Sequence, residues 1–87
     1  MYQPPSDEER ARAVQCIIAN VSEITLQQIY TEISNDPDWL ILHHFFIGAD
    51  IRNLLRINGF NWDDVTLDRE WEPITFTAVR KVSERAR

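Results

Sequence analysis

The sequence is poor in cysteine and in long apolar segments, and each shortage excludes a class of protein. Cys16 is the only cysteine among 87 residues, so no intramolecular disulfide can form and the paired cysteines of zinc motifs are missing. The N-terminal stretch MYQPPSDEERARA lacks the basic and then apolar pattern of a secretory signal. No apolar run reaches the roughly 18 residues that span a bilayer. We therefore expect a soluble, cytoplasmic protein that does not enter a membrane.

Positive charge is missing from a long part of the chain. No lysine or arginine occurs between Arg12 and Arg52, where the acidic residues are Glu23, Glu32, Asp36, Asp38 and Asp50. The net charge is −5, from 14 acids and nine bases, and bases gather in the C-terminal stretch RKVSERAR. Because binding to phosphates needs a basic face, this distribution argues against direct nucleic-acid binding. It predicts instead an acidic surface for another protein that has a basic surface.

The apolar content is sufficient for one core. Hydrophobic residues make up 44% of the chain and include three tryptophans and four phenylalanines. A chain of this length fits one domain. We expect a single helical domain over residues 1–87, with frayed ends at 1–5 and 85–87.

Two helices are marked by capping signals in the first half of the chain. Ser6 and Glu9 form a capping box, and the helix that they open ends at about residues 20–22. A second box begins at Thr25, where Ile24 is placed to pack on Ile29, and this helix ends near residue 35.

A third helix is expected over about residues 37–58. Asp36 and Pro37 are a typical start, and the segment 39–47 is apolar nearly all round, as in a central helix that has neighbours on most sides. Gly59 has the position of a left-handed C-terminal cap, with Phe60 folding back on the last turn.

The last quarter permits two interpretations. Residues 66–82 show a helical face, with a capped start at Thr66 or Asp68, whereas ITFTAV also alternates like a strand. The sequence thus predicts an all-α fold, a compact four-helix domain around a central helix at about 37–58. The alternative is three helices and a small C-terminal β-hairpin that uses Val65 to Leu67.

The stretch HHFFIGADIRN, residues 43–53, combines histidines and charged residues within an apolar helix. The two histidines face different sides, and no second ligand follows either one after three or four residues, so we expect no metal, no cofactor and no catalytic dyad. Gly48 indicates the close crossing of another helix. We interpret the motif as a polar clasp that holds the loop after Gly59, formed by His44, Gly48, Arg52 and Asn53.

A wider pattern runs from TLQQIYTEISNDPDWLILHHFFIGADIRNLLRINGF to LDREW, over about residues 25–71. It resembles an uncharacterised family of small bacterial and phage proteins with a His-Phe-Gly-x-Gly-x-x-Ile-Arg-Asn motif, of which this chain keeps His-Phe-x-x-Gly-x-x-Ile-Arg-Asn. Phe46 stands where that family has its first glycine. The resemblance implies a helical fold and a mobile-element origin, and it carries no activity to this chain.

Three functions follow as hypotheses. The first is a non-enzymatic module that binds another protein, because Trp62 lies in a polar loop where an exposed aromatic side chain would anchor a partner within an acidic rim. Its predicted partner-binding residues are Trp62, Asp63, Asp64, Glu32, Asp36 and Asp38. The second is an acidic decoy that inhibits a nucleic-acid-binding host defence protein, as anti-CRISPR proteins do. The third, which we do not favour, is a small hydrolase or nuclease that uses His43 or His44.

Overall fold

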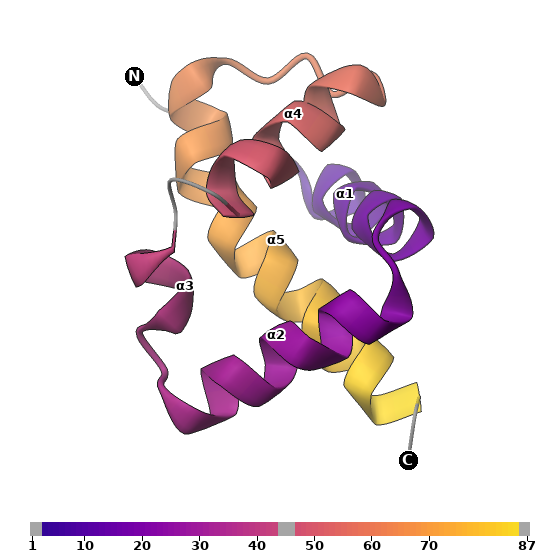
Figure 1. The fold of residues 1–87 in the computed structure, drawn as a ribbon. Helices are drawn as coiled ribbons and strands as arrows, with labels where there is room; N and C mark the ends of the chain where they lie inside the picture. The colour runs from indigo at the N-terminus through magenta and orange to yellow at the C-terminus, as the bar shows by residue number, and fades with distance from the viewer. Residues whose placement is uncertain (1–2, 44–46, 86–87) are drawn as a thin grey trace.

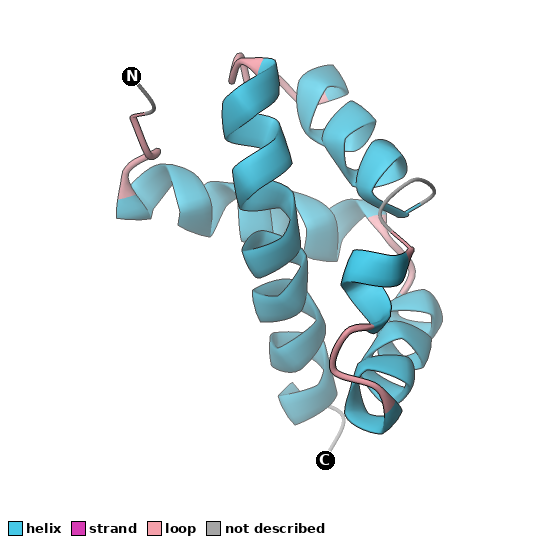
Figure 2. Cartoon of the chain, turned by 90° about the vertical axis from the view of Figure 1, so that its left-hand side faces the viewer, coloured by secondary structure: helices cyan, strands magenta, loops and turns pink. Residues whose placement is uncertain are grey.

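The computed structural model describes residues 3–43 and 47–85, and these residues contain helices and loops but no strand (Figures 1 and 2). The helices are α1 (Asp7–Asn20), α2 (Glu23–Asn35), α3 (Trp39–Leu42), α4 (Ala49–Ile57) and α5 (Asp64–Arg85). The predicted all-α class is therefore confirmed, and the alternative with a C-terminal β-hairpin is wrong. The radius of gyration, 12.4 Å, is that of a compact chain of this length.

The element at the centre is α5, which packs against α1, α2 and α4 (Figure 1). Figure 2 shows α1 running across α5 at a steep angle. The buried side chains of α5 include Leu67, Trp71, Ile74, Ala78 and Val82, which recur every three or four residues and form one wide face. The sequence predicted the central helix at about 37–58 instead. The described part of that range forms α3 and α4, and residues 44–46 lie outside the described residues.

The first two helices begin at serine caps. The Ser6 hydroxyl accepts a hydrogen bond from the backbone N–H of Glu9 at 3.1 Å, so the predicted capping box of α1 is confirmed. Helix α2 begins at Glu23, earlier than predicted, because Ser22 accepts from the N–H of Thr25 at 3.2 Å. The earlier start turns Ile24 outward, where it is 71% exposed, so the predicted packing of Ile24 on Ile29 is wrong.

The turn after α4 has the predicted geometry. Gly59 has a φ of 90°, and the N–H of Phe60 donates to the carbonyl of Leu55 at 3.0 Å, which is the bond of a Schellman motif. Helix α5 starts at Asp64 rather than at Thr66 or Asp68. The reason is Asp63, whose carboxylate accepts from the N–H of Thr66 at 2.7 Å and caps the helix one turn earlier.

Pro73 lies in the interior of α5. A proline in a helix interior costs about 3 kcal/mol because it removes a hydrogen bond and crowds the preceding turn. Trp71, Ile74 and Val79 are each at most 3% exposed, and full burial of such a side chain contributes roughly 1.5–3 kcal/mol. Packing of the two turns around Pro73 therefore outweighs the local cost.

Candidate functional site

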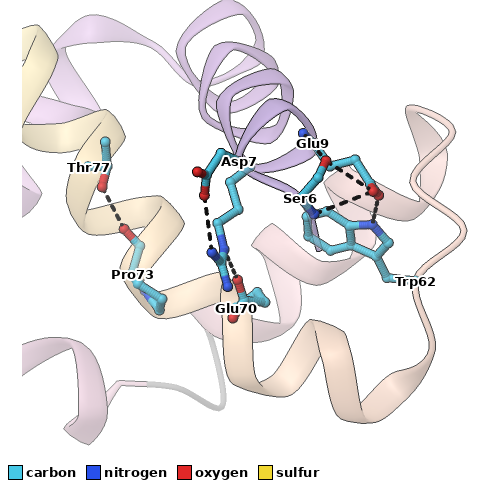
Figure 3. A network of polar contacts seen from close by, with 8 residues as sticks. Ser6, Asp7, Glu9, Trp62, Glu70, Pro73 and Thr77 are labelled. Atoms are coloured by element: carbon cyan, nitrogen blue, oxygen red, sulfur yellow. Dashed lines mark hydrogen bonds and ion pairs between the residues drawn. The ribbon is translucent and has the colours of Figure 1, made fainter. Parts of the chain in front are cut away.

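Trp62, the predicted anchor, is half-buried and holds the loop between α4 and α5 against the start of α1. Its indole N–H donates to Oε2 of Glu9 at 3.0 Å, and its ring meets Phe60 edge-on with centroids 5.3 Å apart. Figure 3 shows Trp62 and Glu9 facing each other beside Ser6. The indole thus serves an intramolecular contact between segments 53 residues apart in the sequence.

Glu9 has a second role that sequence analysis did not find. Besides closing the capping box, its carboxylate accepts the indole N–H of Trp62, and this bond, followed by the one from the backbone of Ser6, lowers the pKa of Glu9 below its usual value. A hydrogen bond to the charged form favours that form. The sequence signal at Glu9 was fully accounted for by the cap, so nothing in it indicated the contact with the loop.

The two aspartates beside Trp62 also have partners within the fold. The cap bond from the Thr66 N–H lowers the pKa of Asp63. Asp64 pairs with Arg56, whose Nη2 lies 2.6 Å from its Oδ1. Arg56 therefore ties the end of α4 to the start of α5, and this is the role that the sequence analysis gave to Arg52 and Asn53.

Of the predicted clasp residues, Arg52 lies near an acid of α5, whereas Gly48 and Asn53 have other neighbours. Gly48 is buried, and a methyl group added there would lie 3.0 Å from the indole of Trp71, which confirms a close neighbour but places a side chain there rather than a backbone. Nη1 of Arg52 is 3.9 Å from Oδ1 of Asp68 and has no hydrogen-bond acceptor among the described residues. Asn53 accepts from Arg56 at 3.3 Å. His44 lies outside the described residues.

His43, the described histidine of the enzyme hypothesis, rests on its own helix turn. Its Nδ1 lies 2.9 Å from the carbonyl oxygen of Trp39, and the two rings stack with centroids 4.4 Å apart. In neutral His43 this bond requires the proton on Nδ1.

A half-buried ion pair adds to the polar contacts around the start of α1. Nε of Arg10 lies 2.5 Å from Oε1 of Glu70, whose side chain is only 9% exposed, and a more distant contact joins Arg10 to Asp7 at 3.6 Å. Figure 3 shows Glu70 beneath the first turn of α1, close to Asp7. These contacts, with Trp62–Glu9 and Arg56–Asp64, define the polar end of the molecule, the region where α1, α4 and the first turns of α5 meet.

The other predicted partner-binding residues, Glu32, Asp36 and Asp38, are all exposed, on the last turn of α2 and on the turn before α3. Oδ1 of Asp36 accepts from the N–H of Asp38 at 3.1 Å. In Figure 1 this turn and the loop before α5 lie at opposite ends of the molecule. The six predicted residues therefore form two separate groups.

A groove that sequence analysis did not predict lies between α2 and α5. The two helices pack where they cross, and their C-terminal ends then point to different sides of the molecule (Figure 1). The groove has a volume of about 430 Å³ and is lined by Tyr30, Ile33, Ser34, Pro37, Phe76, Val79, Arg80 and Glu84. We call it the α2–α5 groove.

Phe76, Arg80 and Glu84 stand out in this lining. Phe76 is 44% exposed, an unusual position for the most apolar type of aromatic side chain. Arg80 and Glu84 are exposed and form no ion pair with any other described residue. The three recur every four residues and so share one stripe of α5. That spacing was the available signal, and the strand-like alternation of ITFTAV obscured it.

Ligand chemistry and known proteins add few constraints. Over residues 3–43 and 47–85 there is no group of three or more histidine, cysteine or acidic side chains placed to hold a metal ion. No helix in the described part of the chain is long and apolar enough to cross a membrane. Comparison with family models, with curated proteins and with solved structures gives no match to this chain.

Proposed function

We propose that this chain is a non-enzymatic protein-binding module and that the α2–α5 groove is its binding surface. The observation that carries the proposal is the exposed ring of Phe76 beside an apolar groove. Protein interfaces combine such an aromatic or aliphatic centre with a polar rim, and a few buried anchors supply most of their binding energy. Tyr30, Ile33 and Pro37 provide the apolar centre, while Arg80 and Glu84 provide the rim.

The groove is a better candidate than the loop around Trp62 for an energetic reason. A partner that used Trp62 as its anchor would have to compete with the bond to Glu9 and the packing on Phe60. A partner in the groove displaces no ion pair, because Arg80 and Glu84 have none among the described residues. Binding in the groove therefore breaks no ion pair of these two residues.

A second candidate function is the acidic decoy, encoded by a phage or another mobile element, that occupies a basic nucleic-acid-binding surface of a host defence protein. It is supported by the exposure of Glu32, Asp36 and Asp38 in a stretch without a single lysine or arginine. Binding of this kind depends on long-range attraction, so it weakens steeply as salt increases. Binding through the groove, with an apolar centre, persists at high salt.

The test is site-specific photo-cross-linking in bacterial cells. The photoreactive residue p-benzoylphenylalanine replaces Phe76 in one variant and Val65, which is 54% exposed on the first turn of α5, in the control. We expect a discrete cross-linked protein from position 76 and none from position 65. This result should be the same whether intact cells are irradiated or the cells are irradiated after lysis in high salt. If position 76 gives no product, or no more than position 65, the groove is not the binding surface.

The same experiment separates the two candidate functions. A third variant carries the photoreactive residue at Glu32, which is exposed on the last turn of α2. A product that forms from position 32 alone, and that does not form when irradiation follows lysis in high salt, supports the decoy and contradicts binding through the groove.

A further inference from the structure

We infer that the occupant of the α2–α5 groove is a second copy of this chain, paired about a two-fold axis. This inference rests on the proposed function, because it names the partner of the same groove. Three features support a second copy: the order of charges on α5, the apolar lining of the groove and the surface area that a pair of copies needs.

The charges at the groove are self-complementary. Arg80 precedes Glu84 by one helical turn, and both line the groove. A two-fold axis across α5 sets the helices of the two copies antiparallel, so Arg80 of each copy faces Glu84 of the other and both contacts form at once. A foreign partner would have to supply this reversed pair of charges, whereas a second copy carries it already.

The two charges are also available for such a contact. Within one helix an acid that precedes a base by four residues pairs better than the reverse order. Arg80 and Glu84 have the reverse order, and no ion pair joins them to each other or to another described residue. Their pairing between copies therefore costs no existing bond.

The apolar part of the lining fits the same arrangement. Phe76 projects from the wall of the groove and is 44% exposed, while Tyr30, Ile33 and Pro37 on the opposite wall leave a space of about 430 Å³. In a symmetric pair the two grooves face each other, so the exposed apolar surface of both copies, including Phe76, is covered together. A standard interface buries about 800 Å² on each partner. That is a modest share of the accessible surface of 5751 Å².

The test is sedimentation equilibrium of the purified 87-residue chain over a series of concentrations at physiological salt. We expect a reversible monomer–dimer equilibrium. Arg80→Glu alone and Glu84→Arg alone each set like charges against each other twice, so each raises the dissociation constant at least about tenfold. Lys81→Glu makes the same charge change as Arg80→Glu on the next position of α5, which lines a different hollow against α1, and it leaves the dissociation constant within about threefold of the unmodified chain.

The decisive sample is a mixture of the two single variants. Arg80→Glu presents two acids and Glu84→Arg presents two bases, so the mixed pair regains both attractive contacts. We expect a heterodimer from two chains that associate poorly alone, with circular dichroism showing that each is folded. A chain that stays monomeric at all concentrations, or a dimer that Arg80→Glu leaves as tight as before, overturns the inference.

Failure of this inference is distinguishable from failure of the proposed function. A monomer that cross-links from position 76 to a different protein keeps the binding module and removes the second copy. A monomer without any product from position 76 removes both. A cross-linked product of twice the mass of the chain supports both.

Discussion

The two ends of α5 differ in how their polar side chains are used. At the polar end, Glu70, Asp64 and the capping residue Asp63 each have a partner within the chain. At the other end, Arg80 and Glu84 form no ion pair among the described residues, although they lie on the same helix. The difference shows that a polar or aromatic side chain in a short chain indicates a binding surface only when it is not already used in a contact that holds the fold together.

Burial explains why the polar end needs its partners. Glu70 is 7% exposed, and a buried carboxylate without a compensating charge is strongly unfavourable. Arg10 supplies that charge from a helix 60 residues away in the sequence. Arg80 and Glu84 are exposed to water, which solvates both without a partner.

The largest expected effect comes from removing Arg10, the partner of the buried Glu70. Arg10→Ala should lower the free energy of unfolding by about 2–3 kcal/mol, because Glu70 stays buried with less compensation, and the melting temperature should fall by roughly 10 °C or more. The matched change at the other end, Arg80→Ala, should alter the free energy of unfolding by less than about 0.5 kcal/mol. Thermal and urea unfolding measure both. Equal losses in the two variants would remove the contrast between the ends.

A smaller effect is expected at Trp62. Trp62→Phe keeps an aromatic ring on Phe60 but deletes the N–H that binds Glu9, so the free energy of unfolding should fall by about 1 kcal/mol. Cross-linking from position 76 should be unchanged in this variant. If stability is unaffected and the cross-linked product disappears, Trp62 is a partner-binding anchor, as the sequence alone predicted.

The smallest effect is a dependence of stability on pH. The folded-state pKa values of Glu9 and Asp63 are lowered by hydrogen bonds from Trp62 and Thr66, so their contribution to stability is complete above the unfolded pKa values. This contribution to stability is lost as the pH falls through the lower pKa values of the folded state. Asp63→Asn keeps a good cap without the charge, so its stability should depend less on acid between about pH 5 and pH 2.

Urea unfolding at several pH values measures this effect, with Asp38→Asn as the control on an exposed residue. Identical pH profiles for Asp63→Asn and the unmodified chain would show that the cap does not favour the charged form.

Local signals predicted local structure well. The capping box of Ser6 and the left-handed turn at Gly59 were both predicted, because each depends on residues within one or two turns. The starts of α2 and α5 were predicted too late, since Ser22 and Asp63 are competing caps that lie earlier in the chain. A choice between two plausible caps depends on the packing of the whole helix.

Contacts between distant segments could not be predicted from the sequence. The bond from Trp62 to Glu9 and the pair of Arg10 with Glu70 join residues 53 and 60 positions apart, and no periodic pattern records such a meeting. The α2–α5 groove depends on the angle at which two helices cross, which side-chain spacing does not determine. The candidate binding surface therefore emerged only from the folded chain.

The central claim is that the α2–α5 groove binds a partner and the polar end does not. The most direct test is a dilution series followed by amide NMR spectra of the ¹⁵N-labelled chain. We expect the concentration-dependent shifts to gather at residues 30–37 and 76–84, around the α2–α5 groove. Shifts that gather at residues 58–64, around Trp62, would contradict the claim. The claim would also be contradicted if the spectra did not change with concentration and position 76 gave no cross-linked product.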